Sequence, residues 1–288
     1  MTSVTIPEGI ATISDNTFLR CTALVDVNIP QSITSIGANA FRYCPFISLE
    51  LPADLQSIGR NAFQDCAKLT SINIPENVTT MGSCVFYGCT SLGSVTFPQN
   101  ITNVPELTFQ NCSNLTSFNI SQNVTDIGTH AFYGCSKLAS ISIPKNVTNI
   151  ADYAFNGCTK LEEVIVEWET PLTVSPTIFY GGVNLSECTL KVPQGTLEDY
   201  QKADVWKNFG QIITSGNIST ADYPVKYNSI LVTVKNRTIT VANAIQPVTI
   251  YNLLGNFIVQ GNLTEFTMPQ AGTYIVRIGN EVQKVIVK

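Results

Sequence analysis

Apolar and polar residues alternate in a pattern that recurs about every 23 residues, from Val4 to about Val192. One unit reads apolar-x-apolar-Pro, then x-x-Val-Thr-x-Ile-Gly-x-x-Ala-Phe-x-x-Cys-x-x-Leu-x-x, and Val78–Pro98 is a representative copy. Phenylalanine fills one column of the pattern, at Phe18, Phe41, Phe63, Phe86, Phe109, Phe132, Phe155 and Phe179. Cysteine fills another, in steps of 22 or 23 residues, at Cys21, Cys44, Cys66, Cys89, Cys112, Cys135 and Cys158. A fixed period in the twenties predicts a solenoid of stacked units, here about 8–9 of them.

Each unit contains two short extended segments. In Leu115–Ile120 the apolar side chains of Phe118 and Ile120 alternate with polar ones, which predicts a half-buried strand. The proline that usually follows ends this strand, because it has no N–H for a ladder. Val-Thr-x-Ile-Gly predicts a second extended segment and a turn. Ala-Phe-x-x-Cys predicts one turn of α- or 3-10 helix, held in place by its buried phenylalanine.

Stacking would align the first segments of successive units in a parallel sheet. The residues on its outward face are mostly small and polar, and we interpret them as a concave, partner-binding face. They are Asp26, Asn28, Ser48, Glu50, Ser71, Asn73, Ser94, Thr96, Ser117, Asn119, Ser140, Ser142 and Glu163. Binding hot spots favour Trp, Tyr and Arg. A partner that used the edge and the convex turns instead would meet Arg20, Arg42, Tyr43, Arg60, Tyr87 and Tyr133.

The full motif, nearly intact at Ile143–Leu161, resembles the bacterial leucine-rich repeats of the BspA-like, or Treponema pallidum, type. The resemblance covers about two-thirds of the chain. It implies a mainly β, right-handed leucine-rich-repeat solenoid with short helical or 3-10 turns. It also implies a secreted or surface protein, because several members of this family are adhesins for host matrix proteins or other bacteria.

The solenoid is expected to span residues 1–213, with a C-terminal cap at 164–213. Terminal repeats are atypical because they close the core against water. Within the cap, residues 195–208 predict a helix with Leu197, Tyr200 and Trp206 on its apolar side.

Trp168 lies in an acidic part of this cap. It could form a ligand-binding spot with the neighbouring carboxylates, Glu162, Glu163, Glu167 and Glu169. An irregular last repeat with a solvated acidic rim is the favoured interpretation.

Residues 214–226 break the repeat pattern and predict a linker to a second domain at 227–288. Short β-rich runs separated by turn residues predict a small antiparallel β-sandwich there, with strands at Ser229–Val234, Thr238–Ala242, Val248–Asn252, Phe257–Gln260, Glu265–Met268, Gly272–Ile278 and Gln283–Val287. The segments Val248–Gly255, Ala271–Ile278 and Lys284–Lys288 resemble the C-terminal sorting domain of the Bacteroidetes type IX secretion system. That resemblance implies an export and surface-attachment address. An accessory sandwich with the same turn chemistry is the alternative.

The net charge and the hydropathy of the chain limit the classes of partner that we expect. The 288 residues have a net charge of −5, and residues 1–216 carry 10 basic against 18 acidic residues. Without a long basic run, nucleic acid is not an expected partner. Apolar runs are too short to span a membrane. We expect an extracytoplasmic protein whose export signal and first cap have been removed from the numbered chain.

The nine cysteines and the single histidine do not predict a catalytic or metal site. Uniform steps of 22 or 23 residues are not zinc-ligand spacing, and parallel Cβ vectors disfavour disulfides. We therefore predict a structural ladder of buried, reduced thiols that pack as small hydrophobes. His130 stands five residues before Cys135, but that cysteine belongs to the ladder. We expect no cofactor, no metal and no enzymatic activity.

Two functions fit the sequence. The first is a secreted or cell-surface protein-binding or adhesion module that recognises a protein or a glycan-bearing surface, on host matrix or on other bacteria. The second is a structural spacer or coat component without a specific ligand, consistent with the chemical uniformity of the polar face.

Overall fold

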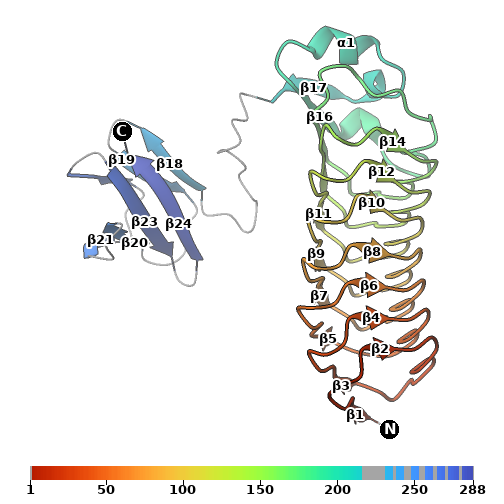
Figure 1. The fold of residues 1–288 in the computed structure, drawn as a ribbon. Helices are drawn as coiled ribbons and strands as arrows, with labels where there is room; N and C mark the ends of the chain where they lie inside the picture. Colours follow the sequence, from red (N-terminus) through yellow and green to blue (C-terminus); the bar gives the residue numbers. More distant parts are fainter. Residues whose placement is uncertain are drawn as a thin grey trace. The chain divides into compact units, whose positions relative to one another are not determined.

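The computed structural model describes residues 2–215, 231–235, 238–242, 248–252, 257–261, 265–269, 272–278 and 281–287. The chain divides into two units, Met1–Asn217 and Ile218–Lys288. The first is a stack of coils in which two columns of short parallel strands run side by side along the stack (Figure 1). The mainly β solenoid that the repeat predicted is therefore confirmed.

The first column of strands continues into the cap. Its members are β1 (Ser3–Thr5), β3 (Asp26–Asn28), β5 (Ser48–Leu49), β7 (Ser71–Asn73), β9 (Ser94–Thr96), β11 (Ser117–Asn119), β13 (Ser140–Ile143), β15 (Glu163–Val166), β16 (Thr189–Val192) and β17 (Gln211–Thr214). Their hydrogen bonds form three parallel sheets, β1-β3, β5-β7-β9 and β11-β13-β15-β16-β17. The gap between β3 and β5 coincides with a coil that is one residue shorter before its proline. The segment from Cys44 to Pro52 has one residue fewer than the equivalent segment from Cys66 to Pro75. Strand β17 ends at Thr214, one residue inside the segment assigned to the linker from sequence.

The second column comes from the Val-Thr-x-Ile-Gly segments. Its strands are β2 (Thr12–Ile13), β4 (Ser35–Ile36), β6 (Ser57–Ile58), β8 (Thr80–Met81), β10 (Asn103–Val104), β12 (Asp126–Ile127) and β14 (Asn149–Ile150). The column breaks between β8 and β10. In flanking coils the N–H of Gly82 donates to the carbonyl of Ile58 at 2.9 Å, and that of Gly128 to Val104 at 2.8 Å. Pro105 occupies the same repeat position without an N–H, so this bond cannot form.

The segment around each phenylalanine is a pair of turns, and the helical turn predicted there is wrong. Phe86 donates its N–H to the carbonyl of Thr108 in the next coil at 2.9 Å, while the N–H of Cys89 bonds back to Phe86 at 3.1 Å. A helix would direct both donors along its own axis. Positive φ angles at Cys84 (59°) and Gly88 (72°) send alternate N–H groups to the neighbouring coil instead. Within the described residues, 3-10 helices occur at η1 (Leu185–Glu187) and η2 (Trp206–Asn208).

A continuous apolar spine fills the stack. The eight predicted phenylalanines are buried, and consecutive rings lie 5.3–5.7 Å apart between centroids and nearly parallel, from Phe18 to Phe179. Buried residues from every coil join them in one cluster. Since burying a phenylalanine side chain contributes about 1.5–3 kcal/mol, each ring of this spine adds substantially to the unit's stability.

The cap closes the spine with aromatic side chains. Helix α1 covers only Leu197–Lys202, because Ala203 is extended and Val205 has a φ of 69°. The predicted helix at 195–208 is therefore too long. This break turns Trp206 into the core, where its Nε1–H donates to the carbonyl of Leu172 at 2.7 Å.

The second unit contains two antiparallel sheets. One is β18-β19-β22, formed by β18 (Leu231–Lys235), β19 (Thr238–Ala242) and β22 (Glu265–Thr267). The other is β21-β20-β23-β24, formed by β20 (Val248–Asn252), β21 (Phe257–Gly261), β23 (Gly272–Ile278) and β24 (Glu281–Val287). Residues of both sheets, among them Ile239, Phe266 and Tyr274, share one core. The predicted pair of packed sheets is confirmed, although the start of the first strand, Ser229, lies outside the described residues. No helix in the described ranges has the length and apolar character that crossing a bilayer requires.

Candidate functional site

The outward side of the first strand column is the first candidate surface. It consists of the polar residues that flank each buried strand centre, and we call it the strand face: Asp26, Asn28, Ser48, Glu50, Ser71, Asn73, Ser94, Thr96, Ser117, Asn119, Ser140, Ser142 and Glu163. Strand register places Ser71 beside Ser94, and Asn73 beside Thr96. These side chains are exposed along most of the stack, and half-buried at Ser140, Ser142 and Glu163. These residues thus line the outward side of the first strand column along the stack.

The strand face is polar and weakly acidic. Its charged side chains are Asp26, Glu50 and Glu163, and Glu163 forms a 2.6 Å ion pair with Lys191 of the cap. The remaining positions are Ser, Thr and Asn, which can donate and accept hydrogen bonds with short, nearly rigid side chains. Such a surface can recognise the backbone or polar side chains of an extended partner, without deep burial.

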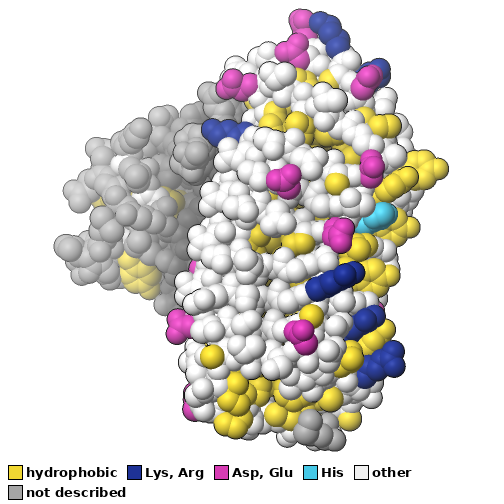
Figure 2. All heavy atoms as spheres, turned by 45° about the vertical axis from the view of Figure 1, so that its right-hand side comes forward, with side chains coloured by type: hydrophobic (Ala, Val, Ile, Leu, Met, Phe, Trp, Pro, Cys, Tyr) yellow, Lys and Arg dark blue, Asp and Glu magenta, His cyan; other side chains and the backbone are white. Residues whose placement is uncertain are grey.

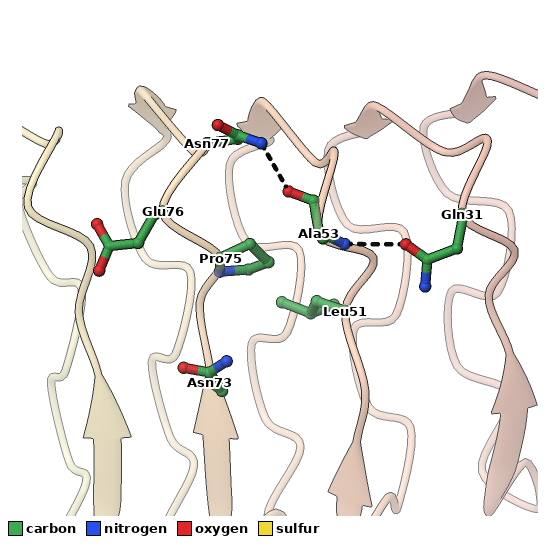
Figure 3. A pocket seen from close by; sticks show the side chains of 7 residues that line it. All are labelled: Gln31, Leu51, Ala53, Asn73, Pro75, Glu76 and Asn77. Carbon is green, nitrogen blue, oxygen red and sulfur yellow. Dashed lines mark hydrogen bonds between the residues drawn. The ribbon is translucent and has the colours of Figure 1, made fainter. Parts of the chain in front are cut away.

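A shallow hollow of about 440 Å³ adjoins the strand face where the strands end (Figure 3). Leu51 and Pro75 form its apolar part, and Asn73 belongs to the strand face itself. Its rim is held by ladder bonds between coils: Asn77 Nδ2 donates to the carbonyl of Ala53 at 3.0 Å. The hollow offers a short apolar side chain of a partner a place beside the polar strand face.

Asparagine side chains repeat this inter-coil bond up the stack. In the next three coils Asn100, Asn123 and Asn146 each donate Nδ2 to a carbonyl 24 residues earlier, at 2.7–2.8 Å. The Asn-x-Thr triplets, which recur in phase with the repeat, thus supply hydrogen bonds to the backbone of the preceding coil.

The paired turns form the second candidate surface, which we call the turn edge. The sequence placed Arg20, Arg42, Tyr43, Arg60, Tyr87 and Tyr133 there, and all six lie in these turn segments. The guanidinium carbons of Arg20 and Arg42 lie 5.5 and 4.9 Å from the centroid of the Tyr43 ring. Arg42 Nε is also 3.9 Å from a carboxylate oxygen of Asp65. The basic groups of the first coils are therefore partly engaged within the chain.

Further up the turn edge, three rings were missed from sequence. His130 stacks on Tyr153 with centroids 5.2 Å apart and an interplanar angle of 13°, and Tyr180 meets Tyr153 edge-on at 6.4 Å. Figure 2 shows apolar side chains and the single histidine gathered along one edge of the molecule. The signal that could have revealed them is the repeat register, because His130 and Tyr153 occupy the position held by Asn16, Asn39 and Asn61 in the first coils.

The cysteine ladder is structural. All nine cysteines are free thiols, and those from Cys44 to Cys158 are buried, whereas Cys21 in the first coil is partly exposed. Burial raises the pKa of Cys44 and of Cys158 to about 12. These thiols remain protonated at neutral pH, so they are poor nucleophiles and poor metal ligands. The prediction of a buried ladder is confirmed except at Cys21.

Trp168 belongs to the cap core rather than to a ligand-binding spot. Its indole is buried, lies tilted at 57° against that of Trp206 with centroids 5.8 Å apart, and donates Nε1–H to the carbonyl of Val147 at 2.7 Å. The backbone carbonyl of Trp168 accepts a 2.9 Å bond from the hydroxyl of Tyr200. An indole fixed in this way is not available to stack on a ligand. In the described ranges, no group of three or more His, Cys, Asp or Glu side chains is placed to hold a metal ion.

Known proteins with a similar sequence or structure identify the repeat family. The family model described as "BspA type Leucine rich repeat region (6 copies)" matches residues 1–116 and 103–223. A leucine-rich repeat protein from Bacteroides ovatus is 28% identical, with a TM-score of 0.61, over 75% of this chain and 54% of that one. This chain thus spans about half the length of that relative.

Two further solved structures align with part of the chain. A leucine-rich cell surface protein from Faecalibacterium prausnitzii is 27% identical over 58% of this chain and 60% of that one, with a TM-score of 0.37. A leucine-rich repeat protein from T. pallidum is 27% identical over 57% and 68%, with a TM-score of 0.43. Comparison with curated proteins finds no match. The match to the repeat family covers the whole stack of coils, and the chain belongs to the BspA-type leucine-rich repeat proteins.

Proposed function

We propose that this protein is a secreted or cell-surface, non-catalytic module that binds another protein through the strand face, in an adhesion role. The observation that carries the proposal is the strand face itself, a continuous row of short polar side chains along most of the stack. Stacked coils suit extended partners, because the surface is long, regular and rigid.

Three further observations support this proposal. The chain belongs to the BspA-type repeat family, and one similar structure is described as a cell surface protein. The hollow at Leu51 and Pro75 gives the strand face an apolar anchor point. The type IX-like features of residues 227–288 are consistent with export and surface attachment of the chain.

The test is a binding screen of the intact chain by biolayer interferometry, against immobilised matrix proteins, bacterial surface proteins and glycans. The expected result is saturable binding to at least one protein, weakened at least tenfold by Asn73→Lys with Asn119→Lys on the strand face. A matched control places the same substitutions on the second strand column, at Asn103 and Asn149, which are also exposed. Equal loss in both variants would refute the strand face as the binding surface.

A structural spacer is the alternative function, favoured by the small, uniform side chains of the strand face. It predicts no saturable binding anywhere in the panel, with a wild-type circular dichroism spectrum. That outcome would overturn the adhesion role.

A further inference from the structure

The turn edge contains a group of side chains whose residue types rarely adopt the left-handed backbone conformation found there. Each of the first seven coils has two left-handed positions in its paired turns, and the earlier of the two has a φ between 54° and 60°. The first three coils fill it with Asn16, Asn39 and Asn61. Asparagine tolerates this conformation, whereas larger side chains crowd the backbone. The next four coils nevertheless place Cys84, Leu107, His130 and Tyr153 there. Asparagine would adopt this backbone with less strain, so the presence of a larger side chain points to a role for that side chain.

The last two of these residues build an aromatic surface with their neighbours. The His130 ring contacts the rings of Tyr133 and Tyr153, with centroids 5.3 and 5.2 Å away. Tyr180 from the following coil extends the row and is 67% exposed. We call His130, Tyr133, Tyr153 and Tyr180 the aromatic cluster.

The charge around the aromatic cluster is negative. Asp152 is exposed and directly precedes Tyr153, and Glu106 is exposed at the same repeat position two coils earlier. A 2.7 Å hydrogen bond from the hydroxyl of Thr177 fixes one oxygen of Asp152. The turn segments 105–112, 128–135, 151–158 and 175–182 contain no Lys or Arg. The basic side chains of the turn edge are confined to the first three coils, at Arg20, Arg42 and Arg60.

A tyrosine elsewhere on the turn edge already binds arginine side chains of the same chain. Two guanidinium groups lie over the ring of Tyr43 at 4.9 and 5.5 Å, within the range of cation–π contact. In the aromatic cluster Tyr180 presents an exposed ring, and Tyr153, which stacks on His130, directly follows the carboxylate of Asp152. No Lys or Arg of the described residues lies over either ring.

We propose that the aromatic cluster binds an arginine-bearing, basic segment of a partner protein, with guanidinium groups over Tyr153 and Tyr180 and an ion pair to Asp152. Tyrosine and arginine are the residue types that dominate protein-binding hot spots. This surface is separate from the strand face, so its function does not depend on the strand-face proposal.

The experiment measures binding of a fluorescent peptide with three spaced arginines to the intact chain, at low and physiological salt. The key variant is His130→Asn with Tyr153→Asn, which introduces the residue that the first three coils carry at this position. We expect its affinity to fall at least tenfold, and Asp152→Asn to reduce it at least threefold. Tyr43→Asn is the matched control, because Asn111 occupies the equivalent left-handed position, and it should bind as the wild type does.

Circular dichroism and thermal melting confirm that each variant is folded before binding is compared. A peptide with glutamine in place of each arginine reports contacts that do not involve the cation, and should bind at least tenfold more weakly. Equal affinity of wild type and the double Asn variant for the arginine peptide would overturn the proposal. Concentration-dependent self-association in sedimentation that Tyr153→Asn abolishes, without peptide binding, would overturn it in favour of a second copy as the occupant.

Discussion

The Sγ–H of Cys112 donates a 3.1 Å hydrogen bond to the backbone carbonyl of Phe86, 26 residues earlier in the chain. The same carbonyl accepts the N–H of Cys89 at 3.1 Å, so one oxygen ties a turn to its own coil and to the next. This bond recurs at 3.1–3.3 Å in five other coils, with donors Cys44, Cys66, Cys89, Cys135 and Cys158. Cysteine thus suits this position, because it is a small apolar side chain that also donates a hydrogen bond.

Replacing this donor should destabilise the stack modestly. Cys112→Ala removes a buried sulfur and one of two bonds to the Phe86 carbonyl, and we expect a loss of about 1–2 kcal/mol in the free energy of unfolding. Urea denaturation measures it. Cys84→Asn, at a cysteine outside the ladder, should be neutral or slightly stabilising, because asparagine suits the left-handed φ of 59°. A Cys112→Ala variant as stable as the wild type would show that the ladder is not a stabilising feature.

Removing one ring from the spine should cost considerably more. Phe109 is fully buried and its ring contacts those of Phe86, Phe118 and Phe132 at 4.9–5.6 Å. Phe109→Ala should lower the free energy of unfolding by about 3–5 kcal/mol, through lost burial and the cavity left behind.

Tyr180→Ala is the control for that variant, because its ring is 67% exposed and should contribute less than about 0.5 kcal/mol. Similar losses for the two variants, measured by the same denaturation, would contradict a spine that carries the stability.

The buried thiols predict sensitivity to alkali. Burial raises the pKa of Cys158 from an ordinary 9.0 to about 12 in the folded state. Below pH 9 the thiol is protonated in both the folded and the unfolded state, so it does not make the free energy of unfolding depend on pH. Between about pH 9 and 12 the unfolded state loses its proton while the folded state keeps it, so stability falls by about 1.4 kcal/mol per pH unit for such a group.

The difference between wild type and Cys158→Ala isolates this contribution, because tyrosines and lysines titrate in both proteins. Urea unfolding at pH 7.5, 9.5 and 10.5 should show a steeper decline for the wild type. Parallel pH profiles would mean that Cys158 does not remain protonated in the fold.

Much of the architecture could be predicted from sequence because its causes are periodic. Phenylalanine and cysteine columns fixed the spine, and alternation at Phe118 and Ile120 fixed the strands. The paired turns were missed because a short Ala-Phe-x-x-Cys segment is equally compatible with a helical turn. The signal was present across coils, since Gly88 and Gly134 precede the cysteine where a left-handed residue is required.

The residues of the strand face could be predicted from the sequence, whereas the rings of His130 and Tyr153 on the turn edge could not. The strand face follows from the two-residue period of a strand, which needs no knowledge of the turns. The positions of His130 and Tyr153 depend on a left-handed backbone that those residue types do not signal. Placing them required the register of Asn39 and Asn61 in equivalent coils.

Alkylation of the nine thiols by iodoacetamide, followed site by site by mass spectrometry, tests most directly whether the coils enclose one dry apolar spine. In the native chain, Cys21 should react within minutes while the six buried ladder thiols react only after denaturation, because their raised pKa and burial leave no accessible thiolate. Alkylation of several of Cys44, Cys66, Cys89, Cys112, Cys135 and Cys158 in the native chain at the denatured rate would contradict the stacked spine on which both surfaces depend.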